Sequence, residues 1–459
     1  MHTETPRELL DRAVTLHQGG EFRASIPFYI RAVRGDEGLA RAEGRGVDPD
    51  ILHAAGVALA MGGKRAEAIQ FLEAAIAGGK GRSGACWSAL GLAYVESRDL
   101  GRAERCYRLA CRFDPDSVAN WTGYANLAAC GGDLPLAERR YQLALNAHAR
   151  DAEELIAQGM TQLRQGKWRT GWRNYEARSQ TAMWTERNSH AAKLRAGGLS
   201  HRTWWNHPTA EDHLYVIAEQ GMGDTVQFAR YLRDIHPRVK SLVLGANPSL
   251  IELLTPALSG ICSVQSHHDD PPEGATAWAL LLSVPAILRV HDPKVVPEAI
   301  RPFGLQWSGL HHVPRGTGGT RVFVHSRGNA AHGYDFDRSA PADLIEQMVR
   351  SAGHTVVTAG FGEHATAGQG VSVRTDPSWR ETVDTLLTCD RCVTVDTGLA
   401  HVAGSLGIPM DLIVPTICEW RWGNPKHTRT PWYPTARLWH RTRTDQWKEV
   451  IANIISSWG

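Results

Sequence analysis

The chain has 459 residues, which is enough for about three domains of ~150 residues each. Its 50 Lys and Arg residues nearly balance 48 Asp and Glu residues, so there is no overall charge that would favour nucleic acid or an anionic membrane. The sequence contains no run of about 18 apolar residues and starts with a mixed-charge stretch rather than a signal peptide. We therefore expect a cytoplasmic protein that neither spans a membrane nor binds nucleic acid.

The cysteines and histidines do not indicate a metal site. Four of the eight cysteines fall in helical segments, where a buried thiol acts as a small apolar group. Cys389 and Cys392 have CxxC spacing, but the sequence has no second CxxC pair to complete a zinc site. The 21 histidines form no cluster with metal-ligand spacing. We expect reduced, structural cysteines, no metal and no cofactor.

Residues 1–180 carry a self-similar period of about 34 residues, which predicts tetratricopeptide (TPR) repeats built from helix pairs. The clearest copy contains Trp87, Leu90, Gly91, Tyr94, Ala103, Tyr107, Ala110 and Pro115. Neighbouring copies contain Trp121, Ala125, Ala137, Tyr141 and Ala144, and Gly56, Ala68, Leu72 and Ala75. Gly171 and Tyr175 indicate a degenerate copy, and Ser25, Tyr29 and Ala32 an N-terminal one before a Gly-rich insertion near 35–49. We expect an α-solenoid whose units are stable only when stacked.

A repeat array of this kind usually presents a concave surface to a protein or peptide. The alternative is that the array only braces the domains that follow. No helix face stands out as basic or acidic in the sequence, so the pattern does not identify a ligand.

Residues 181–212 lack a clear period and contain Trp184, Trp204 and Trp205, which indicates a connecting segment packed by aromatic side chains rather than a flexible linker. From residue 213 the pattern alternates strands and helices, as parallel α/β domains do. The expected strands are 213–218, 241–245, 261–264 and 277–282, with helices at 225–235 and 248–258.

Residues 306–320 are rich in Gly and lack apolar periodicity, which predicts an interdomain linker. A second α/β set follows, with strands at 321–325, 355–358, 392–395 and 410–414 and helices at 342–351, 379–388 and 445–456. The predicted fold is therefore a TPR solenoid (1–180), the connecting segment (181–212) and two Rossmann-like domains (213–313 and 314–459). Ligands should lie at the carboxyl ends of the strands.

The stretch from Cys392 to Pro409 predicts a phosphate site. Its strand feeds a helix through Asp396, Thr397 and Gly398, which leaves the first backbone N–H groups of the helix unpaired and pointing the same way. That arrangement binds phosphate, and the alternative is an ordinary turn in which Asp396 or Thr397 only caps the helix. Two more residues, Leu399 and His401, fall in the first helical turn, where a histidine can donate to a phosphate oxygen or be purely structural.

Two other turns carry polar groups at expected strand ends. In the turn from Glu219 to Asp224, Gly221 and Gly223 allow another molecule to approach the backbone, and Asp224 is placed to cap the next helix. The segment 419–422 contains Glu419, Trp420 and Arg421. An aromatic ring and a bidentate donor suit a base or a sugar ring, although tryptophans can equally pack the domain.

These stretches resemble the heptosyltransferase-type GT-B glycosyltransferases, and most closely a bacterial group that joins TPR repeats to such a domain. The resemblance is carried by 219–231, 395–409, 419–422 and 431–438, which are long and in the right order. It implies sugar transfer from a nucleotide-diphosphate sugar to a hydroxyl on a protein or peptide acceptor recruited by the repeats.

The resemblance also implies roles for individual residues. Asp224 would be the catalytic base, across a cleft from the diphosphate loop, with Glu219 as a second carboxylate. The acceptor side would comprise Gly221, Gly223 and Gln227, and the donor side Arg327, Asn329, Arg338, Asp396, Thr397, Gly398, Leu399, His401, Glu419, Trp420 and Arg421. The basic residues expected around Gly333 and Phe336 are absent. This departure leaves a second interpretation, a non-catalytic TPR binding protein with a degenerate glycosyltransferase-like domain.

Overall fold

The computed structural model describes residues 4–19, 21–44, 46–61, 63–97, 99–147, 151–181, 194, 197–305, 320–329, 335–341, 343–359, 371–373, 378–416, 419–424, 426–441 and 446–458. It divides into two compact units, Met1–Gln158 (unit 1) and Gly159–Gly459 (unit 2). Trp184, Cys418 and nearly all of the predicted linker at 306–320 lie outside the described residues. The domain boundaries at 180, 212 and 313 stay predictions.

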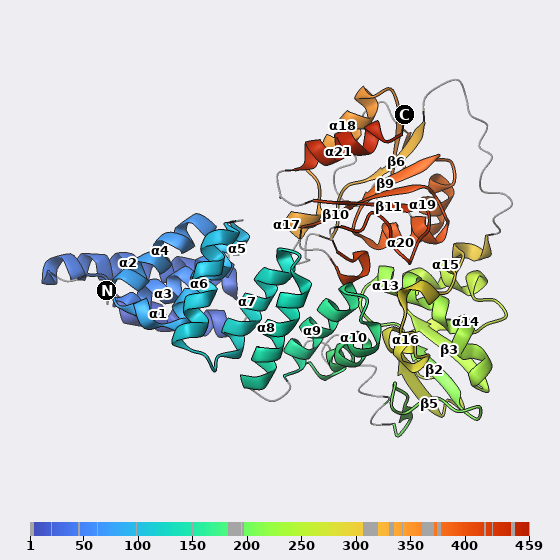
Figure 1. Ribbon diagram of the computed structural model, residues 1–459, viewed down its shortest axis with the longest axis horizontal. Coiled ribbons are helices and arrows are strands. Elements are labelled where there is room, and N and C mark those ends of the chain that lie inside the picture. Colours follow the sequence, from blue (N-terminus) through green and yellow to red (C-terminus); the bar gives the residue numbers. More distant parts are fainter. Residues whose placement is uncertain are drawn as a thin grey trace. The chain divides into compact units, whose positions relative to one another are not determined.

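Unit 1 consists of helices that pack in consecutive pairs (Figure 1). They are α1 (Pro6–Gln18), α2 (Phe22–Glu43), α3 (Pro49–Met61), α4 (Arg65–Ala77), α5 (Gly84–Glu96), α6 (Leu100–Phe113), α7 (Val118–Cys130) and α8 (Leu134–Ala147), followed by α9 (Ala152–Arg164), inside which the two units divide. The first helices of successive pairs, α3, α5, α7 and α9, begin 35, 34 and 34 residues apart. This spacing confirms the predicted TPR-like repeats.

The repeats of unit 1 are joined by aromatic rings that fill spaces left by glycines. The buried ring of Tyr107 lies 3.1 Å from where a Cβ on Gly91 would sit, and a Cβ on Gly123 would overlap the same ring. Tyr107 also stacks on Tyr124, with ring centroids 6.2 Å apart. One ring from α6 therefore contacts both its own repeat partner and the next repeat, which is why the units need to be stacked.

The start of unit 1 differs from the expectation. The Gly-rich insertion expected near 35–49 is helical as far as Glu43, because α2 runs straight through Gly35 and Gly38. A Cβ on Gly35 would lie 3.1 Å from Pro6, so the missing side chain allows α1 and α2 to pack closely. That close packing offsets the low helix propensity of glycine. The helix ends at Gly44, whose φ of 68° is the left-handed conformation that glycine favours.

Unit 2 contains two parallel sheets and the last helix of the predicted repeat region, α10 (Trp168–Tyr175). The first sheet has the order β1-β5-β2-β3-β4. Its strands are β1 (Ser200–His201), β2 (His213–Ile217), β3 (Ser241–Ala246), β4 (Ser263–Ser266) and β5 (Ala277–Leu280). Its helices are α13 (Met222–Phe228), α14 (Leu232–Ile235), α15 (Pro248–Ala257) and α16 (Val284–Ile287). All its strand pairs are parallel, and β5 is buried along its whole length.

The second sheet has the order β11-β10-β9-β6-β7-β8 and is also parallel throughout. Its strands are β6 (Arg321–His325), β7 (Thr355–Ala359), β8 (Val371–Val373), β9 (Arg391–Val395), β10 (Met410–Val414) and β11 (Ala436–His440). Its helices are α17 (Asp335–Arg338), α18 (Leu344–Ser351), α19 (Trp379–Leu386), α20 (Gly398–Ser405) and α21 (Trp447–Ser456). Helices α18 and α21 pack together on the core formed by β6, β9 and β10 (Figure 1).

Two features of the described residues concern the cysteines and the length of the apolar helices. The seven described cysteines are free thiols, and burial raises the pKa of Cys86 to about 11 and those of Cys106 and Cys262 to about 12. Burial also raises the pKa of Cys392 well above its usual value. Within the described residues no helix is both long and apolar enough to cross a membrane.

The glycine contacts of unit 1 lead to a first prediction. Gly123→Ala should destabilise unit 1 by about 1–3 kcal/mol, because the added methyl group overlaps the Tyr107 ring. Gly101→Ala is the matched control, since a Cβ there meets only an Asp99 oxygen at 3.8 Å and alanine is the better helix former. Urea unfolding followed by circular dichroism measures both variants. Equal stability of the two variants would show that Tyr107 does not hold the repeats together.

Candidate functional site

The carboxyl ends of strands from both sheets of unit 2 bring polar loops together. The turn from Glu219 to Asp224 follows β2, and the turn from Asp396 to Gly398 follows β9. The 3₁₀ turn η9 (Trp420–Trp422) comes after β10. Helices α13 and α20, which begin at two of these turns, are in contact. The predicted phosphate turn and the predicted base therefore belong to one site.

Asp224 is held at the start of α13. Its Oδ2 accepts a hydrogen bond from the Gly221 N–H at 2.8 Å. Gly221 is the N-cap, so Asp224 stabilises the helix start from the third helical position and is not the N-cap that the sequence predicted. Its Oδ1 accepts a hydrogen bond from Arg421 Nη2, and the pair forms a salt bridge. Its side chain is 18% exposed, so water still reaches it.

Arg421 joins the two sheets. Its guanidinium donates from Nη2 to Asp224, from Nε to Gln227 Oε1 at 2.9 Å and from Nη1 to Glu419 Oε2 at 2.6 Å. The plane also lies over Trp420, 4.5 Å from the ring centroid. With a side chain only 7% exposed, Arg421 forms charge-assisted bonds in a largely desolvated position, where such bonds are strong. We call Arg421, Asp224, Gln227 and Glu419 the Arg421 clamp.

Burial raises the pKa of Asp224 above its usual range, the Arg421 charge opposes that shift, and the Glu419 charge reinforces it. The same two carboxylates raise the pKa of Arg421, so this guanidinium stays charged. The carboxylate of Asp224 is therefore more basic than an exposed aspartate, which suits a group that must take up a proton.

Glycines allow the two helix starts to touch. A Cβ on Gly398 would lie 3.6 Å from the Gly223 amide nitrogen, and a Cβ on Gly223 would lie 2.6 Å from the ring of His401. Gly221 is exposed at the same turn. The preceding Gln220 has a φ of 70°, a conformation that costs a non-glycine residue stability and that is common at functional sites.

His401 is a buried, oriented group in the first turns of α20. Its Nδ1 hydrogen-bonds the Tyr433 hydroxyl at 2.9 Å, and its ring stacks on Trp422 with centroids 5.3 Å apart. Burial, reinforced by the charge of Arg421, lowers the pKa of His401 well below its usual value. His401 is therefore neutral near pH 7, so one ring nitrogen can act as a hydrogen-bond donor without carrying a charge. Leu399, by contrast, is buried in the apolar core.

Asp396 and Thr397 lie at the start of α20. Burial raises the pKa of Asp396 to about 6, with a further upward contribution from the Glu419 charge and opposing effects from Trp422, Arg421 and Arg338. Thr397 is the N-cap of α20, but its side chain makes no capping bond and its hydroxyl is buried without a hydrogen-bond partner. Several other buried hydroxyls of the described residues, such as that of Thr203, also have no such partner, but that of Thr397 lies at a helix start, where it could donate to a ligand oxygen.

Glu219 is enclosed by a second network that the sequence did not indicate. Its Oε1 accepts a hydrogen bond from Arg178 Nη2 at 2.7 Å, and its Oε2 accepts one from the Leu281 N–H at 3.1 Å. Arg178 also donates to Ser283 Oγ at 2.9 Å and lies 3.6 Å from Glu176. Both side chains of the central pair are at most 4% exposed. Glu219 therefore anchors the turn before Asp224 rather than facing solvent.

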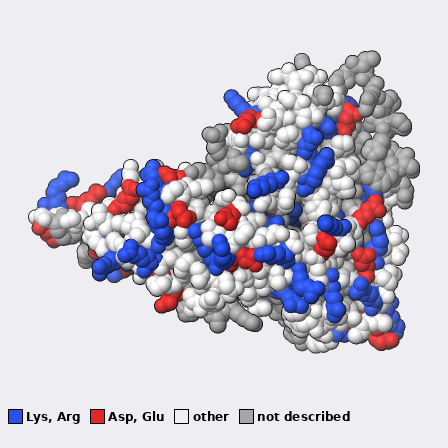
Figure 2. Space-filling view, viewed as in Figure 1, with Lys and Arg blue, Asp and Glu red and all other residues white. Residues whose placement is uncertain are grey.

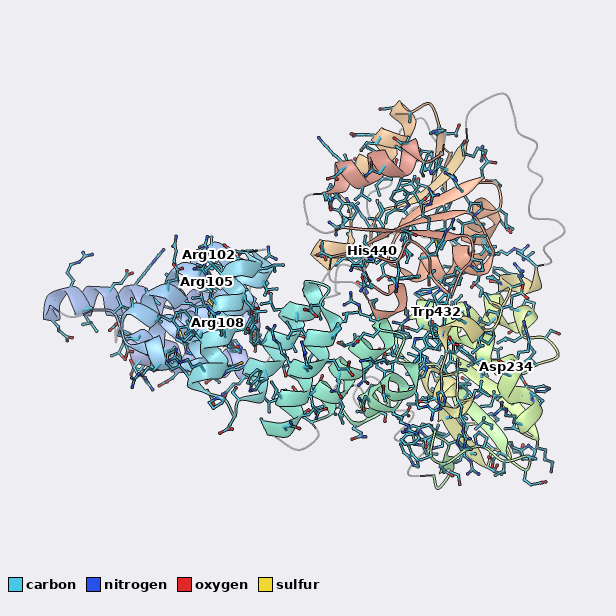
Figure 3. The ribbon with its side chains drawn as sticks, in the orientation of Figure 1. Arg102, Arg105, Arg108, Asp234, Trp432 and His440 are labelled. Atoms are coloured by element: carbon cyan, nitrogen blue, oxygen red, sulfur yellow. The ribbon has the colours of Figure 1, made fainter. Side chains whose placement is uncertain are left out.

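Trp420 packs inside an aromatic cluster. Its ring lies edge-on to Trp172 of α10, with centroids 5.3 Å apart, and against Trp432 at 6.0 Å. Trp432, labelled in Figure 3, stacks in turn on Trp168 of α10, with centroids 5.3 Å apart. Helix α10 thus packs against the aromatic residues next to the Arg421 clamp, and the ring of Trp420 contributes to this packing.

The loop after β6 lies beside the loop after β9, because β6 and β9 are neighbouring parallel strands. Arg338 is paired with Asp335 at 3.0 Å and donates to the Asn329 carbonyl at 3.4 Å. Arg327 and Asn329 are exposed. Arg338 also acts electrostatically on Asp396, so this loop belongs to the same site. Its positive charge is already partly balanced by Asp335.

The structure thus gathers residues from four loops around the Arg421 clamp. From the first sheet come Gly221, Gly223, Asp224 and Gln227, and from the second come Arg338, Asp396, Thr397, Gly398, His401, Glu419 and Arg421. Arg178 and Tyr433 are the additional residues, and only their contacts reveal them. Across the described part of the chain, no three His, Cys, Asp or Glu side chains are arranged to hold a metal ion.

Comparison with known proteins gives likeness to TPR proteins over about two fifths of the chain. No family model matches the chain, and no curated protein matches it. A thermophilic TPR protein of Thermus thermophilus is 18% identical over 42% of this chain and 96% of that chain, with a TM-score of 0.35. PilF of Pseudomonas aeruginosa is 16% identical over 42% and 82%, with a TM-score of 0.32. MamA of Desulfovibrio magneticus is 12% identical over 38% and 94%, with a TM-score of 0.31. The repeat assignment depends on the helix pairs of unit 1 and not on these likenesses.

The enclosed network around Glu219 leads to a second prediction. Arg178→Met should destabilise unit 2 by about 3–5 kcal/mol at pH 7, because it leaves the buried Glu219 without its counter-charge. The loss should shrink as pH falls and the unpaired carboxylate takes up a proton. Arg380→Met, in an i,i+4 pair with both side chains about half exposed, is the control and should change stability by less than about 1 kcal/mol. Urea unfolding at pH 7 and pH 5 tests this, and losses of the same size in both variants would contradict it.

The raised pKa of Asp396 leads to a third prediction. The folded chain holds a proton on Asp396 up to about pH 6, whereas the unfolded chain releases it near pH 4, so the contribution of this group to stability falls as pH rises through that window. Asp396→Asn should therefore be more stable than wild type by about 1–3 kcal/mol at pH 7.5 and nearly equal at pH 4. Asp384→Asn, at an exposed site, serves as the control. A difference for Asp396→Asn that does not vary with pH would refute the assignment.

Proposed function

We propose that the protein is a GT-B-type glycosyltransferase that moves a sugar from a nucleotide-diphosphate sugar to a hydroxyl. The observation that carries the proposal is the Arg421 clamp, in which a carboxylate at the start of α13 pairs with a guanidinium beside the start of α20. In sugar transfer the base and the phosphate site must lie near the same anomeric carbon. The base takes the proton of the acceptor hydroxyl, and the phosphate site stabilises the negative charge of the leaving diphosphate.

The donor diphosphate would bind at the start of α20. The backbone N–H groups of the first turn and the helix dipole favour an anion there, and Gly398 leaves the backbone accessible. The unpaired Thr397 hydroxyl would donate to a phosphate oxygen. Arg421, with Arg338 further along the edge, would offset the charge that develops on the leaving diphosphate.

Asp224 would act as the general base. The acceptor hydroxyl gives its proton to the Asp224 carboxylate while its oxygen forms a bond to the anomeric carbon. The bond from that carbon to the diphosphate oxygen breaks, and the nucleoside diphosphate leaves with the electron pair. The raised pKa of Asp224 favours this proton uptake.

Binding of the donor requires the clamp to rearrange. The Gly223 amide nitrogen lies only 3.6 Å from the position of a Cβ on Gly398, so a diphosphate cannot enter between the two helix starts as they stand. We infer that α13 and α20 separate and that Arg421 exchanges Asp224 for a diphosphate oxygen. That exchange would also free the base, so donor binding and activation of Asp224 would be coupled.

The TPR-like repeats would supply the acceptor. Stacked helix pairs commonly bind peptides or proteins, and the repeats of unit 1 have this architecture. The acceptor hydroxyl would then belong to a protein side chain. A soluble nucleotide sugar and a protein partner are therefore the two ligands that we assign.

A second function is favoured by one observation. Arg421 is already paired with Asp224 and Glu419, and Arg338 with Asp335, so these two cations are balanced by carboxylates of the chain itself. A binding protein that has lost sugar transfer would have this property. Hydrolysis and binding assays over UDP-, GDP-, ADP- and CMP-linked sugars distinguish the two functions.

The fourth prediction separates the proposed base from its capping role. Asp224→Asn should keep the bond to Gly221, because the side-chain oxygen of asparagine can accept the same N–H. Sugar transfer, measured to water or to a protein acceptor, should nevertheless slow by roughly 10²–10⁴-fold. Asp384→Asn is the control, because Asp384 is 54% exposed in a pair with Arg380 and lies outside the Arg421 clamp, and its activity should stay within a few-fold of wild type.

Two outcomes would count against this function. If folded Asp224→Asn transfers sugar as fast as wild type, Asp224 is only structural. If wild-type protein neither binds nor hydrolyses any of the four classes of nucleotide sugar, the binding-protein function replaces the enzyme.

A further inference from the structure

The segment that was expected to be packed by aromatics leaves one tryptophan on the surface of unit 2. Trp205 is 61% exposed, although its neighbour Trp204 is partly buried. The two rings meet edge to face, with centroids 5.3 Å apart, and Arg173 of α10 lies 4.4 Å from the centroid of Trp204. Trp205 is thus presented on a firm support, and an exposed tryptophan on such a support is a common contact residue.

Three segments contribute cationic or titratable groups to this part of unit 2. Arg169 and Arg173 are exposed on α10, and Arg289 is exposed just after α16. Arg289 Nη2 lies 3.4 Å from His207 Nε2, which comes from the loop that holds Trp205. The indole N–H of Trp172 donates to the Val290 carbonyl at 3.1 Å and fixes α10 beside this segment.

The charges are close enough to act on one another. The pKa of His291 is lowered first by burial and then by the charges of Arg169, Arg173 and Arg289. Of the acids in these segments, Asp212 pairs with Arg202 at 2.7 Å, whereas Asp292 is exposed and accepts the Lys294 amide N–H at 2.9 Å. Figure 2 shows Lys and Arg side chains gathered over the part of unit 2 that contains α10 and α16.

Arg289 occupies a position that normally suits glycine. Its φ is 58°, and it closes α16 through bonds from its own N–H to the Ala286 carbonyl at 3.1 Å and from the Val290 N–H to the Pro285 carbonyl at 2.9 Å. Helices that end this way usually have glycine at the left-handed residue, because any other side chain costs stability there. Arg289 therefore holds its exposed guanidinium on a left-handed residue, at a cost in stability.

We propose that this surface, formed by Trp205, Arg169, Arg173, Arg289, His207 and His291, binds an acidic segment of a protein partner. Guanidinium groups bind carboxylates through paired hydrogen bonds, and tryptophan with arginine is the typical composition of a protein-binding hot spot. Single-stranded nucleic acid would call for successive stacking rings along a basic groove, whereas Trp205 offers one exposed ring. The proposal does not depend on sugar transfer, because none of these residues belongs to the Arg421 clamp.

Fluorescence anisotropy tests the proposal on the full chain. The probe is a short fluorescein-labelled peptide of alternating Glu and Asp with one central Phe, measured at low salt beside a Gln and Asn peptide and an oligothymidylate of equal length. Wild type should bind the acidic peptide and not the neutral one, and Trp205→Ala and Arg289→Gly should each weaken binding by about tenfold or more. Arg233→Gln, at an exposed arginine elsewhere in unit 2, should bind as wild type does.

Arg289→Gly also separates binding from folding. Glycine fits the left-handed position, so this variant should melt at or above the wild-type temperature while it loses affinity. The proposal is overturned if wild type does not bind the acidic peptide, or if Trp205→Ala and Arg289→Gly bind it as tightly as wild type. Tighter binding of oligothymidylate than of the acidic peptide would assign the surface to nucleic acid instead.

Discussion

One guanidinium, that of Arg421, determines how the two sheets of unit 2 meet. It bonds to Asp224 and Gln227 on the side of the first sheet and to Glu419 on the side of the second, in a position that water hardly reaches. A charge removed from water in this way is tolerated only while its partners stay in place. The contact between α13 and α20, the orientation of Asp224 and the closure of the predicted phosphate turn therefore all depend on the same three hydrogen bonds.

Two other buried ion pairs order the loops of unit 2. Arg178 and Glu219 hold the turn before α13, and Arg441 donates to Asp337, whose carboxylate also accepts from Thr416 at 2.6 Å. Asp337 and Arg441 are both fully buried, so they connect α17 to the end of β11 without access to water. Buried ion pairs contribute little net stability but are sensitive to geometry. They explain how irregular loops at the strand ends keep a defined arrangement.

The sequence predicted the regular parts of the fold well, because those parts follow local periodicity. The strands at 321–325 and 410–414 were predicted with the bounds that are observed, since each contains three consecutive apolar residues, at 322–324 and 412–414, in a parallel sheet. β11 was missed because Arg437 and His440 interrupt its apolar pattern and a Pro-rich turn precedes it. β1 was missed because it has only two residues.

The site could be predicted only in part. The turns at 219–224 and 396–398 were identified from glycine and capping patterns, which are local. The pairing of Asp224 with Arg421, 197 residues apart in the chain, and of Arg178 with Glu219 depends on how the sheets close, which no local pattern encodes. For the same reason Asp224 was expected across a cleft from the phosphate turn, whereas α13 and α20 are in contact. The exposure of Trp205 was also unexpected, since its neighbours in the chain indicated a packed segment.

The reactivity of the buried cysteines can be used to follow unfolding of the protein. Cys86, Cys106 and Cys111 are buried in unit 1, and Cys392 is buried in the second sheet of unit 2. Burial both shields these thiols and raises their pKa values, so alkylating reagents, which attack the thiolate, reach them only when the surrounding helices or strands open. Pulses of alkylation followed by peptide mapping would therefore record the opening of the repeats and of the second sheet separately, in the natural sequence and without an added label.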